Sequence, residues 1–400
     1  MLRNVLLPLW PPLLLAFFAT PNPYAALHSG RVGFDASVTS DALAINQALL
    51  ISCALAMAWL IRAQPVLRAP LVLCIGFVSL LLSGVWNGTL FDKPHSYAYD
   101  MGSFLLVSTL ALAPHRSENL KTLYWLSCLA ILLALLAAFL QPSRWGAPNF
   151  AFSRIDRGEL PLAAYLGCYL LFPALTFVAR DIPLWFRLAA WSVISFLTIA
   201  MFSRTPIYLF VMPALTYGLC AIRSRLLFCL LSAGLVAFAT ISLIWFAENV
   251  DMDLLLTGRL ELWLFHLKQF AESPLLGGGA FLATRSSDYM GAAESEVGVL
   301  KSFAEHGIVW GGTQLWVVAT ACISALRWLR SKEDPSMSMY GLVVLTATPL
   351  FLLEGFSRIL SASEAIFWLC AFRLYAQRKI PESLRTHDLP ADRPAYRFAP

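Results

Sequence analysis

The chain has 400 residues, of which 58% are hydrophobic and only 13% are charged, so it lacks the polar surface that two or three water-soluble domains would need. Its formal net charge of +5 is spread between hydrophobic stretches, without the dense basic tract that would indicate a nucleic-acid partner. The composition predicts a membrane protein whose main solvent is lipid.

The hydrophobic stretches favour helices. Membrane strands alternate polar and apolar residues, whereas runs such as Leu129 to Leu140 are continuously apolar. A bilayer core of about 30 Å requires about 20 mostly apolar residues per helix, and we expect about twelve spans. The first resembles a secretory signal, but we interpret it as an uncleaved helix because the rest of the chain also spans the membrane. The predicted spans are Val5–Thr20, Leu43–Ile61, Pro70–Trp86, Gly102–Ala113, Leu123–Leu140, Leu160–Ala179, Leu188–Phe202, Pro206–Ile222, Leu226–Phe246, Ile308–Leu326, Met339–Leu353 and Ala365–Tyr375.

Lysine and arginine are concentrated in short, acid-poor connections on one side, which predicts a cytoplasmic position for those connections and for both termini. The opposite connections are long and would face the periplasm of a bacterial inner membrane. We therefore expect the first nine helices in residues 1–246, a large helical periplasmic loop in residues 247–307, the last three helices in residues 308–377 and a cytoplasmic tail in residues 378–400. The basic residues of the short connections are Arg62, Arg68, Arg116, Lys121, Arg180, Arg187, Arg223, Arg225, Arg327, Arg330 and Lys332.

Several arginines lie on the outer side, against this charge trend. Arg204 follows Ser203 at the outer mouth of a helix pair. It either extends to the membrane interface or serves as a bidentate clamp on a phosphate, for which a planar guanidinium is well suited. The outer arginines are Arg144, Arg154, Arg157, Arg204, Arg259, Arg285 and Arg358.

The large loop begins with a segment of helical spacing. Arg259, Trp263 and His266 share one face, and we expect Leu260, Leu264 and Leu267 to supply an apolar face. His266 is then either a structural or a catalytic residue. The glycine triplet at 277–279 is not followed by Gly-Lys-Ser/Thr, so it predicts a tight turn rather than a nucleotide-binding loop.

A second short helix is expected from residue 294 to Gly307, where glycine can end or kink a helix before the next span. Glu294 and Glu296 stand at its start. They are either partners of the helix dipole or a base beside an anion site. The eight cysteines all fall within apolar runs, so we expect no disulfide, and we assign no metal site and no cofactor.

The order of these motifs resembles the shared core of the bacterial O-antigen ligase and O-antigen polymerase superfamily. The resemblance rests on Ser203-Arg204, on Gly258-Arg259 followed by Trp263, on Ser-Pro-Leu-x-Gly-x-Gly from Ser273, and on a short helix ending in Gly307-Ile308. It covers roughly residues 202–312, and the span layout extends it in outline.

This resemblance implies a GT-C-like, metal-independent inverting glycosyltransferase. The donor would be a glycan on undecaprenyl diphosphate, and the acceptor a sugar hydroxyl of another glycan or of lipid A-core. The leaving diphosphate needs positive charge, for which Arg204 and Arg259, assisted by Arg154 or Arg157, are the candidates. The acceptor hydroxyl needs a positioned base.

The sequence departs from the ligases at that base. They typically have His-Asn at the start of the short helix, where this chain has Glu296 and Val297. An acidic residue there is more typical of capsular or exopolysaccharide polymerases, with Glu294 or Glu296 as the base and His266 as the next candidate. We therefore favour a polymerase, with a ligase as the alternative and a transporter of lipid-linked glycans as the competing class.

Overall fold

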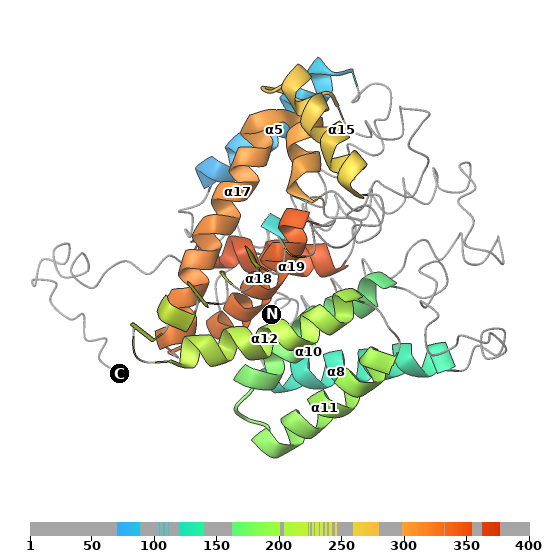
Figure 1. The fold of residues 1–400 in the computed structure, drawn as a ribbon, viewed down its shortest axis with the longest axis vertical. Coiled ribbons are helices and arrows are strands. Elements are labelled where there is room, and N and C mark those ends of the chain that lie inside the picture. Colours follow the sequence, from blue (N-terminus) through green and yellow to red (C-terminus); the bar gives the residue numbers. More distant parts are fainter. Residues whose placement is uncertain are drawn as a thin grey trace, which may run out of the picture.

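The computed structural model describes residues 70–88, 120–139, 162–200, 204–222, 259–279, 298–331, 333–353 and 362–376, with single positions between 104 and 111 and between 224 and 245. Within these residues every regular element is a helix and no strand occurs (Figure 1). The all-helical class predicted from the sequence is confirmed for this part of the chain. The predicted spans Val5–Thr20 and Leu43–Ile61 lie outside it, as does the predicted tail.

The helices coincide with the hydrophobic stretches. α5 has the bounds predicted for its span, most other ends differ by a few residues, and α17 begins well before the predicted Ile308. The predicted spans Gly102–Ala113 and Leu226–Phe246 are described only at single positions, all of them helical. The helices are α5 Pro70–Trp86, α8 Leu120–Phe139, α10 Leu162–Val178, α11 Leu184–Ala200, α12 Arg204–Ala221, α15 Arg259–Glu272, α17 Val299–Ser331, α18 Pro335–Leu353 and α19 Ala362–Ala376.

Local side chains stabilise the start of α18 and the turn before α11. Asp334 precedes α18, and its Oδ1 accepts hydrogen bonds from the backbone nitrogens of Ser336 at 2.8 Å and Met337 at 3.3 Å. Pro335 follows at the first helical position, where it loses no hydrogen bond. At the turn between α10 and α11, the buried Arg187 donates through Nε to the carbonyl oxygen of Ile182 at 2.9 Å and through Nη1 to that of Thr176.

α18 and α19 lie at the centre of the described helices (Figure 1). α18 contacts α10, α12, α17 and α19, and α19 also contacts α10 and α17. α19 is buried along almost all of its length. Phe351 of α18 stacks on Phe367 of α19, with ring centroids 5.7 Å apart. The core is therefore built from helices close to the carboxyl end of the chain, with α10 and α12 packed around them.

α17 and α18 are long and apolar enough to cross a membrane. From Ile308 to Arg330, α17 rises about 33 Å at 1.5 Å per residue, which matches a bilayer core of about 30 Å. Its amino end lies beside α5 and α15 at the top of Figure 1, and its carboxyl end lies at the opposite end of the molecule, near the carboxyl end of α12. There Arg330 lies within electrostatic reach of Cys220.

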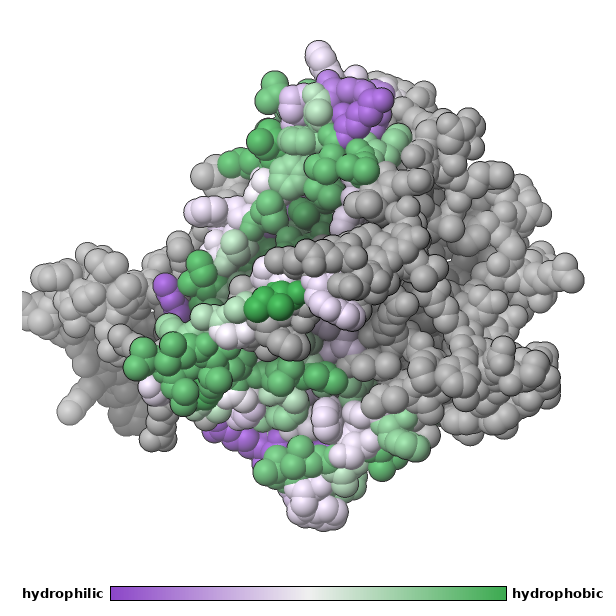
Figure 2. All heavy atoms as spheres, viewed as in Figure 1, coloured by the Kyte–Doolittle hydropathy of each residue, from purple (hydrophilic) through white to green (hydrophobic). Residues whose placement is uncertain are grey.

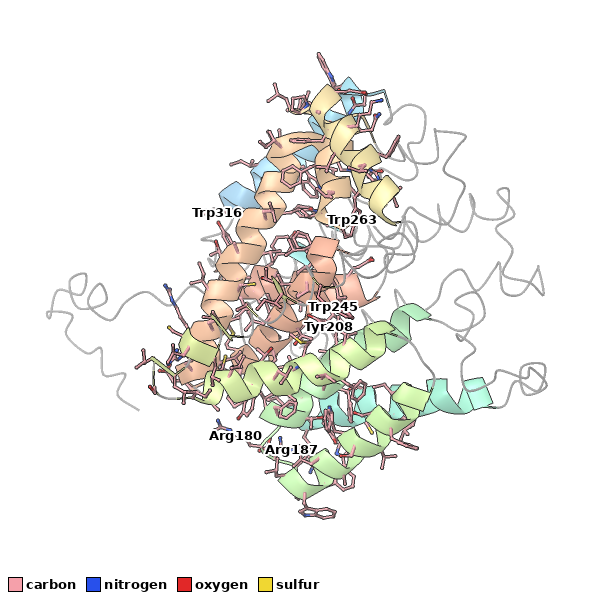
Figure 3. The ribbon with its side chains drawn as sticks, in the orientation of Figure 1. Arg180, Arg187, Tyr208, Trp245, Trp263 and Trp316 are labelled. Carbon is pink, nitrogen blue, oxygen red and sulfur yellow. The ribbon has the colours of Figure 1, made fainter. Side chains whose placement is uncertain are left out.

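Large apolar side chains are exposed along the outer faces of α5 and α17. They include Val78, Leu82 and Val85 of α5, and Trp316 and Ile323 of α17. Figure 2 shows hydrophobic residues over much of the described surface on the face that it presents, and Figure 3 shows Trp316 pointing away from the helices. Contiguous apolar surface of this kind marks contact with lipid or with another protein.

Candidate functional site

The two motif segments of the expected loop pack against each other at one end of the molecule. α15 lies on the first turns of α17, where Leu262 is buried against Trp263, Phe265 and Leu300. Phe270 of α15 meets Phe303 of α17 edge to face, with centroids 5.5 Å apart. Figure 3 shows Trp263 on α15, at the opposite end of the molecule from Arg180 and Arg187. The segments thus form one packed unit although residues 280–297 separate them in sequence.

Gly307 interrupts α17 at the point where this unit is formed. Its backbone has φ 77° and ψ −176°, so the helix before it ends and the long helix after it starts in a new direction. The turn that follows α15 crosses the chain at this kink. Gly278 and Gly279 donate to the carbonyl oxygens of Ala304 and Glu305 at 2.7 and 3.0 Å, and Ile308 donates to the carbonyl oxygen of Pro274 at 2.8 Å. The predicted kink and the predicted tight turn are both confirmed.

α5 closes the crossing from a third side. The Oγ of Ser83 donates to the carbonyl oxygen of Leu276 at 2.8 Å and lies 3.3 Å from Nδ1 of His306. Nδ2 of Asn87 also donates to the carbonyl oxygen of Leu276, at 3.2 Å. Three sequence-distant segments therefore satisfy their backbone groups at one place, as buried polar groups require.

The buried face of the short helix carries ionisable groups. Lys301, Glu305 and His306 are 3%, 1% and 2% exposed. Nζ of Lys301 lies 4.0 Å from Oε1 of Glu305, one helical turn away, and Nε2 of His306 lies 3.9 Å from Oε2. Burying isolated charges costs far more than burying a pair, so the carboxylate is held between two nitrogen-bearing groups.

His266 faces this cluster from α15. Its side chain is 1% exposed, and neither ring nitrogen has a hydrogen-bond partner among the described residues. Burial lowers the pKa of His266 to about 4, Glu305 acts in the opposite direction, and Lys301 adds to the lowering. The imidazole is therefore neutral at pH 7, with an unprotonated nitrogen that can accept a proton.

Three of the seven site residues predicted from the sequence lie within the described part of the chain. His266 lies in the packed unit, and Arg204 and Arg259 are the first residues of α12 and α15. The remaining candidates, Arg154, Arg157, Glu294 and Glu296, lie outside the described residues.

The structure shows which face of α15 is packed. Leu264 and Leu267, which belong to the expected apolar face, are exposed, whereas Leu262 and His266 are buried. The reason is that the helix packs across α17 through its aromatic residues, so the face that carries the histidine turns inward.

Sequence reasoning missed the polar cluster of Lys301, Glu305 and His306, and also Ser83 of α5 and the next-following Asn87, which pack beside it. One signal was available: a lysine and a glutamate four residues apart, followed at once by a histidine and a long apolar span. Charged residues so close to a span are costly unless they are paired or functional. Ser83 and Asn87 carry no comparable signal.

The part of the chain that the structure describes is all-helical, with two helices long and apolar enough to cross a membrane and a buried polar site where two of its segments meet. No model of a known protein family matches the sequence, and no curated protein matches it.

Proposed function

We propose that this protein is a metal-independent membrane glycosyltransferase that moves a glycan from undecaprenyl diphosphate to a sugar hydroxyl, and that it polymerises the repeat units of a bacterial surface polysaccharide. One observation carries the proposal. The two stretches that hold the superfamily-like motifs pack into one unit, with His266 buried beside Lys301 and Glu305. A motif pair that makes one polar site is what a shared catalytic core requires.

The proposed setting is the bacterial inner membrane, with about twelve spans, both termini in the cytoplasm and the site on the periplasmic face. Two features support it. α17 is long enough to separate the site from Arg330 by the thickness of a bilayer core. The exposed apolar faces of α5 and α17 are suited to lipid.

Positive charge is the main chemical requirement of the donor, because the diphosphate leaves as a stable anion. We assign this role to Arg204 and Arg259, with Arg154 or Arg157 assisting. Arg204 and Arg259 are each the first residue of a helix, where the partial positive charge of the helix end also favours a bound anion. Such a position is unfavourable for a cation alone and favourable once an anion binds.

The acceptor hydroxyl needs a proton acceptor on the opposite side of the anomeric carbon from the diphosphate, since the reaction inverts that carbon. The candidates are Glu296, Glu294 and His266. An acidic residue at position 296 favours a polymerase, whereas transfer to lipid A-core is the alternative. No cofactor takes part in this scheme.

The test is a transfer assay with the purified protein in lipid nanodiscs, a lipid-linked repeat unit as the donor, and lipid A-core present or absent. Longer chains on the lipid carrier support the polymerase, and transfer only to lipid A-core supports the ligase. If the protein forms neither product, with or without a divalent ion, the proposed function is wrong.

A matched pair of variants tests the diphosphate assignment. Arg259→Lys replaces a two-pronged guanidinium by a point charge and should weaken donor binding about tenfold or more. Arg180→Lys makes the same change on an exposed side chain in the turn between α10 and α11, and should bind the donor as the wild type does (Figure 3).

A further inference from the structure

His266 is a buried histidine whose ring makes no hydrogen bond to the described residues. An unsatisfied buried polar group costs about 1–3 kcal/mol, and His266 has two ring nitrogens with no hydrogen-bond partner among the described residues. Its helix is not free to turn them outward, because α15 ends in the turn that crosses α17 at Gly307. A protein can retain such a cost in its empty state when a bound ligand later supplies the missing hydrogen-bond partner.

Among the described residues, two charged groups of α17 act on the imidazole of His266, Glu305 and Lys301. His306 adjoins Glu305 on its other side, the neutral Ser83 of α5 lies beside His306, and Asn87, the residue after α5, donates to Ser83. On α15 itself, Lys268 and Glu272 are exposed. Within the described part of the chain, Glu305 is therefore the carboxylate placed to balance a positive charge on His266.

We infer that His266 and Glu305 form the proton-accepting pair of the transfer reaction, with His266 as the base and Glu305 as the residue that stabilises its protonated form. This inference rests on the proposed function. It selects His266 over Glu294 and Glu296, and it adds Glu305, which the sequence did not single out. Lys301 and His306 hold the Glu305 carboxylate at 4.0 and 3.9 Å.

The transfer needs only the donor, the acceptor and a base. The acceptor oxygen forms a bond to the anomeric carbon while the bond from that carbon to the diphosphate oxygen breaks, and the electron pair leaves with the diphosphate. The hydroxyl proton passes to a ring nitrogen of His266. The resulting imidazolium faces Glu305, as a carboxylate stabilises the imidazolium in other acid–base pairs.

Donor binding should make this base stronger. A nearby negative charge favours the protonated form of histidine, and the diphosphate brings negative charge to the site. His266 is thus a weak base in the empty protein and a stronger base when the donor is present. The imidazole therefore stays unprotonated until the donor binds.

The first experiment measures, without substrate, how Glu305 and Lys301 change the titration of His266. Full-length protein in nanodiscs carries ¹³C-labelled histidine, and His266→Gln assigns the His266 signal. Glu305→Gln should move the His266 titration to lower pH, because it removes the charge that favours the imidazolium, and Lys301→Met should move it to higher pH. Glu305→Asp keeps the charge and should stay closer to the wild type, and Glu272→Gln, an exposed carboxylate on α15, should leave the midpoint unchanged. No displacement in Glu305→Gln would overturn the pair.

The second experiment is the transfer assay as a function of pH. His266→Gln should lose on the order of 10²–10⁴ in rate while still binding the donor. Glu305→Gln should also be slower, and the acid limb of its rate profile should move to lower pH. A wild-type rate in His266→Gln would overturn the inference and leave the proposed function standing. A wild-type protein that transfers no glycan would overturn the proposed function and the catalytic role with it.

Discussion

Gly277 and Gly307 each stand where the other segment's backbone passes. A Cβ atom on Gly277 would lie 2.5 Å from the backbone nitrogen of His306, and one on Gly307 would lie 2.6 Å from the backbone nitrogen of Leu276. Both glycines have positive φ, 72° and 77°. The crossing that builds the site thus needs glycine at both positions, for conformation and for space.

Gly307→Ala and Gly277→Ala should each destabilise the packed unit by at least about 2 kcal/mol, since a strained backbone and a clash with rigid backbone add together. Gly312→Ala is the matched control, because a Cβ at this helical glycine of α17 meets nothing within 4 Å. Thermal unfolding in nanodiscs, followed by tryptophan fluorescence, measures the difference. Equal melting temperatures for Gly307→Ala and Gly312→Ala would contradict the crossing.

Ser83→Ala should destabilise the contact between α5 and the crossing by about 1 kcal/mol, because the carbonyl oxygen of Leu276 loses one of its donors. Ser108→Ala is the comparison, since the hydroxyl of Ser108 donates to the carbonyl oxygen of Phe104, four residues earlier, at 2.6 Å. Hydrogen exchange at residues 273–279 provides the measurement. Faster exchange in Ser83→Ala alone is the expected result, and faster exchange in both variants would argue against a specific link.

α5 and α17 show which features of the fold can be predicted from the sequence and which cannot. The bounds of α5 follow from hydrophobicity alone, because a run of apolar residues bounded by polar ones leaves little choice. The kink at Gly307 follows from glycine before an apolar span. The partners of the crossing do not follow, because Ser83 and Leu276 meet only through tertiary packing between distant segments. The buried face of α15, with Leu262 and His266, does not follow either, since helical spacing alone does not say which face meets a neighbour.

Arg187 was interpreted only as a topological charge, but its guanidinium donates to the carbonyl oxygen of Thr176 in α10 and to that of Ile182 in the turn before α11. Arg187→Met should therefore lower the stability of this helix pair by about 1–3 kcal/mol, because two carbonyl groups lose a charged donor. Arg180→Met removes an exposed arginine from the same turn and should change stability by less than about 0.5 kcal/mol. Similar melting temperatures for the two variants would refute the clamp.

The topology predicts that Arg330 and the α15 unit lie on opposite sides of the membrane. Reporter proteins fused after Arg68, Arg116, Arg187, Arg225 and Arg330 should read cytoplasmic, and those inserted within residues 247–307 should read periplasmic. α12 and α17 contact each other, and their carboxyl ends lie at the same end of the molecule, so fusions at these two ends should agree with each other (Figure 1). A periplasmic reading after Arg225 would rule out the arrangement.

Lys301 and Glu305 separate stability from chemistry. Lys301→Met leaves the carboxylate with less compensation in a buried place, and removal of one partner of a buried pair typically costs about 3 kcal/mol. The double change Lys301→Met with Glu305→Leu removes both charges and replaces them with apolar groups of similar size, so most of that loss should be recovered. Melting temperatures of the two single variants and the double variant give the coupling between the residues. If the pair serves packing alone, the double variant regains transfer activity together with stability. If Glu305 stabilises the protonated His266, the double variant regains stability and remains slow, and that is the result we expect.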